Sequence, residues 1–256
     1  MRITRLAKLQ RALVVLATLL IFKVTAEVVW GYRNYLPPNF DSDFLRGRES
    51  YFFGGYQWAF YTHIAASPIA MIVGTILISE RFRRRLPRWH RVLGRIQAAS
   101  ILLAVAPSGL WMAYYAAPGT LAAISFASLA FATGTCAALG LRAAVQRRFM
   151  VHRRWMWRGY LLLCSAVVLR LIGGLATVCG VQAEWFDPVA SWACWLAPLG
   201  AYEWIGRLTQ KRNQFSTLAT ESLPATEMSA RHSAAGSSAP RKCTLPSTKA
   251  ACVPPG

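Results

Sequence analysis

The sequence predicts an all-α protein, a polytopic bundle of six transmembrane helices followed by a disordered C-terminal tail. Its 256 residues are 55% hydrophobic and only 15% charged, with a mean hydropathy of +0.32. Lys and Arg nevertheless number 29, against 10 Asp and Glu. Apolar runs that alternate with basic loops produce both properties at once. A soluble nucleic-acid-binding protein would be rich in charge throughout, so we expect no nucleic-acid partner.

Six apolar stretches each approach or exceed the roughly 20 residues that a helix needs to cross a bilayer. Runs such as Ile69–Val73 do not alternate apolar with polar residues, as the strands of a membrane barrel do, so the spans are predicted to be helices. Prolines inside three of them are of the kind that membrane helices tolerate. The predicted spans are residues 11–31, 52–79, 92–117, 120–141, 155–180 and 188–205.

The remaining segments complete the predicted organisation. Residues 1–10 form a basic N-terminus, residues 11–207 the transmembrane domain, and residues 208–256 a tail rich in Ser, Thr, Ala and Pro. Such a composition favours disorder. The first span also resembles a secretory signal, with a cleavage-like site at Val24–Ala26,. Because its apolar run continues through Trp30, we favour a retained helix; cleavage would leave five spans.

The distribution of charge among the loops predicts the orientation. Basic residues crowd the N-terminus, the connections around residues 80–91 and 142–158, and the stretch after the sixth span, whereas the alternate loops are sparse or acidic. By the positive-inside rule both termini are therefore cytoplasmic. The expected partners of such a multi-pass protein are the lipid bilayer and anionic lipid head groups.

Three ionisable residues fall at one depth within the spans, which makes them candidate functional groups. Lys23, His63 and Arg170 each lie roughly 12–15 Å from the predicted outer surface, at ~1.5 Å per residue. With Tyr61 near its mouth, such a positive pocket suits a small anion, a carboxylate or a quinone head group. In the alternative, Lys23 snorkels outward beside Glu27 while His63 hydrogen-bonds a neighbouring helix.

A second polar layer lies at the predicted cytoplasmic face. His90 and His152 each precede a helix that runs outward, and they are 62 residues apart, so they lie at nearly equal depth. Such imidazoles could ligate one haem b iron, hold a metal, relay protons, or only anchor the helices at the head groups. With four histidines in the chain, at most one such haem fits. The charged residues expected to have structural or ionic roles are Glu27, Arg91, Arg95, Arg158 and Glu203.

The motifs of several enzyme classes are absent. The sequence contains no Walker A loop, no dinucleotide-binding glycine fingerprint, no H-E-x-x-H and no G-x-S-x-G,. Nucleotide hydrolysis, metalloprotease chemistry and serine hydrolysis therefore receive no support. We predict no dedicated metal site and favour a protein that is not an enzyme.

Five landmarks follow one another through the predicted spans. They are Tyr61-x-His63, His90-Arg91-x-x-Gly94-Arg95, His152-x-x-Trp155-Met156-x-Arg158-x-Tyr160, Leu169-Arg170-Leu171 and Glu203. Together, over about residues 52–207, they resemble a bacterial family of predicted membrane proteins, the domain of unknown function 2306. The resemblance implies a location in the bacterial inner membrane. It also implies that the histidines, Arg170 and Glu203 matter together, without implying an activity.

Three functional hypotheses follow from these residues. In the first, the protein is a redox protein that holds one haem b between His90 and His152 and exchanges electrons with a quinone. In the second, it transports or senses a small anion or carboxylate through Lys23, His63 and Arg170. In the third, it is a non-catalytic membrane scaffold whose polar residues serve packing and lipid anchoring.

Overall fold

The computed structural model describes residues 2–42, 44–117, 119–181 and 183–221. All regular elements in this part of the chain are helical, which confirms the predicted all-α class. Along the chain the elements are α1 (Arg2–Gly31), η1 (Tyr32–Asn34), α2 (Glu49–Tyr51), η2 (Phe52–Tyr56), α3 (Gln57–Ile78), α4 (Glu80–Arg85), α5 (Pro87–Ser100), η3 (Ile101–Val105), α6 (Ala106–Tyr114), α7 (Thr120–Val145), α8 (Phe149–Leu163), α9 (Ser165–Val178) and α10 (Phe186–Glu221).

Five helical stretches among the described residues are long and apolar enough to cross a membrane. They coincide with the first five predicted spans, and they are Arg11–Asn34, Glu49–Ile78, Pro87–Tyr114, Thr120–Val145 and Phe149–Val178. A lipid bilayer is therefore the environment of this protein.

The sixth predicted span lies within α10, which is not one of these five stretches. Tryptophan, proline and Glu203 dilute the aliphatic content of its first half. The helix also continues beyond the predicted end at residue 205, through Glu221, because Gln210, Lys211 and Arg212 favour a helix. The remainder of the predicted disordered tail, residues 222–256, lies outside the described part of the chain.

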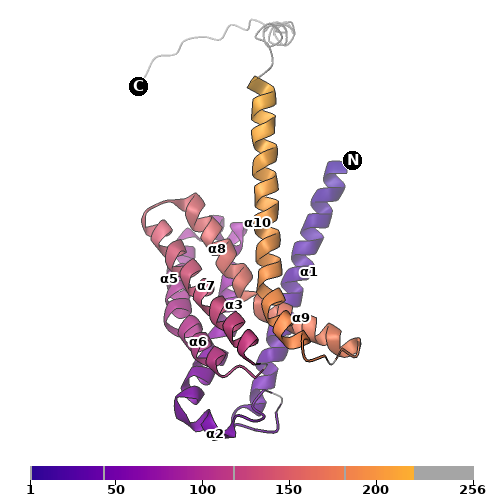
Figure 1. Ribbon diagram of the computed structural model, residues 1–256. Helices are drawn as coiled ribbons and strands as arrows, with labels where there is room; N and C mark the ends of the chain where they lie inside the picture. The colour runs from indigo at the N-terminus through magenta and orange to yellow at the C-terminus, as the bar shows by residue number, and fades with distance from the viewer. Residues whose placement is uncertain (1, 43, 118, 182, 222–256) are drawn as a thin grey trace, which may run out of the picture. The chain divides into compact units, whose positions relative to one another are not determined.

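The chain divides into two units, Met1–Glu203 and Trp204–Gly256. In the first unit α7 packs along α6 and α8, and α3 contacts α1, α5, α6 and α8; Figure 1 shows α3, α5, α7 and α8 side by side. Small residues allow this close approach. A Cβ added at Gly74 would lie 3.4 Å from the Tyr160 ring, and one at Gly159 would lie 3.4 Å from the Cys136 Cβ.

Buried polar side chains fasten the helices of this unit to one another. The Gln97 side chain on α5 donates to the Ala70 carbonyl on α3 (2.8 Å). On the other side, Trp195 of α10 donates to the Ser125 hydroxyl on α7 (3.0 Å), and Ser125 donates to the Ser191 carbonyl (2.8 Å). Such bonds help to hold helices together in lipid, where the hydrophobic effect does not favour their association.

The two most basic connections lie at the same end of the first unit. Arg84 donates to Glu80 through Nη2 at 2.6 Å, and this pairing is the main reason that the pKa of the Glu80 carboxyl lies below its usual value, with smaller contributions from Arg83 and Arg153. Arg153 belongs to α8, whereas Glu80 begins α4. Their electrostatic contact therefore brings the connection before α5 next to the start of α8.

Candidate functional site

A cavity of about 530 Å³ lies inside the first unit, between α1, α3, η3, α6, α7, the end of α8, α9 and the first half of α10. Its volume is within the range of small-molecule sites, roughly 300–1,000 Å³. Most of its wall is apolar. The polar and ionisable residues of the wall are Thr25, Glu27, Tyr32, Tyr35, His63, Ser67, Thr133, Ser165 and Arg170.

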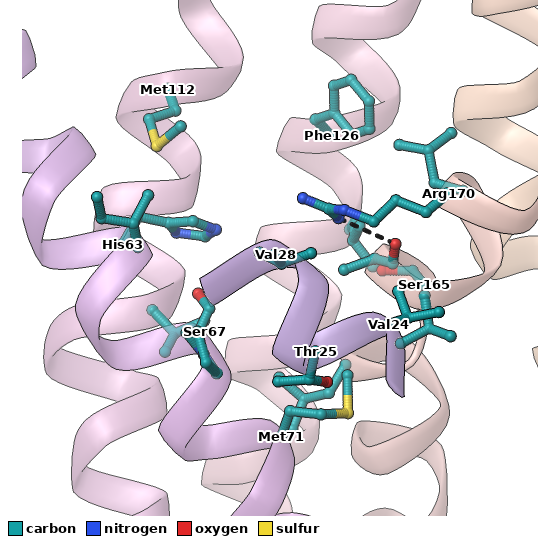
Figure 2. A pocket seen from close by; sticks show the side chains of 18 of the residues that line it. Val24, Thr25, Val28, His63, Ser67, Met71, Met112, Phe126, Ser165 and Arg170 are labelled. Atoms are coloured by element: carbon teal, nitrogen blue, oxygen red, sulfur yellow. Dashed lines mark hydrogen bonds between the residues drawn. The ribbon is translucent and has the colours of Figure 1, made fainter. Parts of the chain in front are cut away.

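Arg170 projects into this cavity from α9 (Figure 2). Its Nη1 donates to the Ala166 carbonyl one turn earlier, at 3.1 Å. The titratable groups that act on the guanidinium are the phenols of Tyr32 and Tyr35, which follow α1. The chain is interrupted at Cys164 between α8 and α9, so the segment that carries Arg170 is a separate helix set at its own angle.

His63 faces Arg170 from α3, on the opposite wall of the cavity (Figure 2). Its Nδ1 lies 3.0 Å from the Ser108 hydroxyl oxygen. That hydroxyl donates its hydrogen to the Ala104 carbonyl at 2.5 Å, so we assign Nδ1–H as the donor to Ser108 from this network. The other nitrogen, Nε2, is then the hydrogen-bond acceptor of the neutral imidazole.

The local structure of the third span explains why Ser108 can hold His63. Pro107 has no N–H to donate to the preceding turn, and residues Ile101–Val105 form a π-helical turn, η3. The Ser108 hydroxyl donates back to the carbonyls of Ala104 and Val105 in its own span, at 2.5 and 3.2 Å, and its oxygen remains available to accept from His63. Single π-turns inside α-helices are frequent at functional sites, and this one directly precedes α6, the helix that carries Ser108.

Ser67 is a site residue that the sequence reasoning missed. It lies one helical turn after His63, lines the same cavity, and its buried hydroxyl oxygen has no hydrogen-bond partner among the described residues. In the sequence it is one small residue among several with helical spacing, which indicates close packing. Its spacing of four residues from His63 is the signal that could have placed it on the same face.

Two of the predicted pocket residues lie elsewhere. Lys23 does not line the cavity; its ammonium pairs with Glu27 at 2.7 Å, and both side chains are more than half exposed. The Tyr61 hydroxyl donates to the Tyr35 carbonyl at 2.9 Å. Tyr61 therefore contacts Tyr35, which lines the cavity, but does not line the cavity itself. Of the predicted residues, the structure thus brings His63 and Arg170 together and leaves Lys23 and Tyr61 outside.

The second histidine layer is separate from this cavity, since neither His90 nor His152 lines it. His152 Nδ1 donates to the Gly140 carbonyl at 2.8 Å, which leaves Nε2 as its acceptor. His90 lies near enough for the two rings to interact electrostatically, and its buried Nδ1 has no hydrogen-bond partner within the described residues. No group of three or more His, Cys, Asp or Glu among the described residues could hold a metal ion.

An ion pair joins α8 to α10 close to this end of the unit. Arg158 Nε lies 2.6 Å from Glu203 Oε1, and about a third or less of each side chain is exposed. The Arg158 guanidinium also lies over the Trp155 ring, 4.7 Å from its centroid. Arg91 and Arg95, by contrast, are exposed on α5.

Comparison with known proteins points to one family. A family model described as a predicted membrane protein, DUF2306, matches residues 60–203. The matched range holds His63, Ser67, Arg170 and the Arg158–Glu203 pair, and it begins after Lys23. No curated protein and no solved structure matches the chain.

Proposed function

The chain belongs to the DUF2306 family of predicted membrane proteins, and from that premise we propose that it binds a small amphiphilic ligand in the cavity between α3 and α9. The observation that carries the proposal is the pair of polar groups directed at one another across a cavity with a mostly apolar wall, the Arg170 guanidinium and the His63 imidazole (Figure 2). Ligand sites commonly combine an apolar wall with a few convergent polar groups of this kind. Transport and sensing both begin with such binding.

The proposed orientation puts the basic end of the first unit in the cytoplasm of a bacterium, with the protein in the inner membrane. The argument is the positive-inside rule, applied to the connections around α4 and the start of α8. Electrostatic contacts of Glu80 with Arg153, and of His90 with His152, support their placement at one end. In this orientation the N-terminus lies on the cytoplasmic side.

Ligand-dependent stabilisation of the purified protein tests the proposal. The panel is decanoate, decanol and a decyl-substituted quinone, and the readout is thermal unfolding in mild detergent. At a hundred times its Kd a ligand of the cavity stabilises the fold by about 2.7 kcal/mol. We expect at least one member of the panel to raise the Tm and Ser67→Leu, which fills the cavity, to abolish that rise.

Thr62→Leu is the matched control for this variant. Thr62 lies on the same helix, is exposed, and does not line the cavity, so the ligand response should be retained. If no member of the panel changes the Tm of the wild-type protein, ligand binding in the cavity is contradicted and the scaffold hypothesis is favoured. The same conclusion follows if Ser67→Leu and Thr62→Leu respond alike.

A second candidate function is one haem b held between His90 and His152. The observation in its favour is the hydrogen bond from His152 Nδ1 to the Gly140 carbonyl, because an axial histidine is commonly oriented by such a bond while Nε2 binds the metal. We expect a Soret band in protein purified from haem-replete cells, lost in both His90→Ala and His152→Ala and retained in His63→Ala. Colourless, iron-free wild-type protein would contradict this candidate.

A further inference from the structure

We propose that the ligand of the cavity is an acidic amphiphile, with one anionic head group at Arg170 and an apolar chain along α1 and α9. This inference rests on the proposed function and adds the chemical class of the ligand. The head group can be a carboxylate or a phosphate monoester, because both present the oxygens that a guanidinium binds in a bidentate manner.

The first argument for an anionic head group is the balance of charges in the cavity wall. Arg170 donates to a neutral carbonyl, that of Ala166, and the groups that act on it electrostatically are two neutral phenols. Glu27 is the acidic side chain among the described residues of the wall, and its carboxylate is paired with Lys23 at 2.7 Å. The described chain therefore supplies Arg170 with no carboxylate of its own.

The position of Arg170 within a membrane-spanning stretch makes this imbalance costly. This residue lies in the membrane-spanning stretch Phe149–Val178, eight residues before the end of that stretch. Arginine inside a span is costly, and it faces a protein interior or pairs with another group. A ligand that brings its own negative charge gives the guanidinium an anionic partner that the described residues do not supply, whereas a neutral ligand does not.

The rest of the head-group site can accept or donate hydrogen bonds. The Ser67 hydroxyl is buried with no hydrogen-bond partner in the described part of the chain, and it lies with His63 on the wall opposite Arg170 (Figure 2). Either can hold a second oxygen of the head group, directly or through a water molecule. An acid with two or three oxygens fits these groups better than a single hydroxyl or a lone carbonyl does.

One part of the cavity wall is apolar and could contact the hydrocarbon chain of the ligand. Val24 and Val28 of α1 line the cavity together with Met71, Leu163 and Val167, and these side chains belong to one packed apolar cluster. The neighbouring residues of α1, such as Leu16 and Leu19, are exposed large hydrophobic side chains, as expected for a surface that contacts lipid. A hydrocarbon chain can therefore lie between the cavity and the bilayer without exposing apolar surface to water.

Equilibrium binding to the full chain in phosphatidylcholine nanodiscs tests the inference. The probes are radiolabelled palmitate, lysophosphatidate and the neutral alcohol hexadecanol. We expect wild-type protein to bind at least one of the two acids at least tenfold more tightly than hexadecanol, and Arg170→Gln to lose at least tenfold in that affinity. Arg170→Lys should retain part of it, because it keeps the charge without the planar guanidinium.

Arg95→Gln is the matched control, since it removes an exposed arginine that does not line the cavity; the affinity of this variant for the acid should equal that of the wild type. Hexadecanol binding as tightly as both acids would overturn the inference and leave ligand binding intact. An acid affinity unchanged in Arg170→Gln would do the same. If Arg170→Gln does not fold, the comparison of acids with alcohol on the wild type and on Arg170→Lys decides. Absence of binding by every probe would contradict the proposed function itself.

Discussion

Replacing Gly140 with valine is expected to destabilise the helical bundle by about 2 kcal/mol or more, because overpacking a tight interface costs typically 1–3 kcal/mol. Gly140 lies on α7 where this helix packs along α8. A Cβ at this position would overlap the Met156 methyl group and approach the Trp155 Cβ to 3.5 Å. The end of a methionine side chain can move aside, so Gly140→Ala should be the milder change; the two γ-methyl groups of valine leave less room for that movement.

The matched control is Gly174→Val, on α9. A Cβ at Gly174 meets nothing within 4 Å, and the residue is exposed, so this variant should unfold close to the wild type. Thermal unfolding in one detergent measures all three variants. Equal losses of stability in Gly140→Val and Gly174→Val would contradict the packing argument, because a general intolerance of valine in place of helical glycine would then explain both.

Hydropathy and charge predicted the fold from the sequence to within a few residues at most helix ends. The reason is that a bilayer requires a continuous apolar helix in each span. The apolar composition of the sequence was therefore sufficient to predict the first five spans. The interruptions inside the spans carry a weaker signal. Pro107 indicates a kink, but nothing in the run around Cys164 indicates that α8 ends there and α9 begins at Ser165.

The candidate site was harder to predict because depth along a helix does not give the direction of a side chain. Lys23, His63 and Arg170 were predicted to share a depth, yet α1 turns Val24 and Thr25 toward the cavity and leaves Lys23 exposed beside Glu27. Successive residues of a helix differ in direction by about 100°, so one position separates a wall residue from one outside. A prediction that also considered which face of the first helix packs against the other spans would have favoured Thr25 over Lys23 as a cavity residue.

The ion pair between Glu203 and Arg158 could not be predicted from the spacing of residues within one helix either. Four residues after it, Arg207 has the spacing of a helical ion pair, but the structure pairs Glu203 with Arg158, 45 residues earlier on α8. Long-range pairs of this kind depend on how helices are arranged in space, which periodicity within one helix does not encode.

Neutralising Glu203 is expected to destabilise the protein by about 1–2 kcal/mol, because Glu203→Gln leaves the Arg158 charge without its carboxylate at 2.6 Å,. The magnitude is set below that of a fully buried pair because 27% and 35% of the two side chains are exposed. Arg158→Gln should have a similar effect for the converse reason. The double variant should cost clearly less than the sum of the two, since a partner left unpaired contributes much of each single loss.

A double-mutant cycle measured by chemical unfolding in mild detergent separates this coupling from other contacts of either residue. We expect a coupling energy of about 1 kcal/mol. The control cycle uses Glu80→Gln and Arg84→Gln, since that pair has nearly the same bond length, 2.6 Å, but more than half of each side chain is exposed; it should show no measurable coupling. Additive effects of Arg158→Gln and Glu203→Gln would mean that the pair does not join α8 to α10 energetically. A coupling confined to the Arg158–Glu203 pair would instead show that partial burial in the bundle, which the control pair lacks, gives this contact its strength.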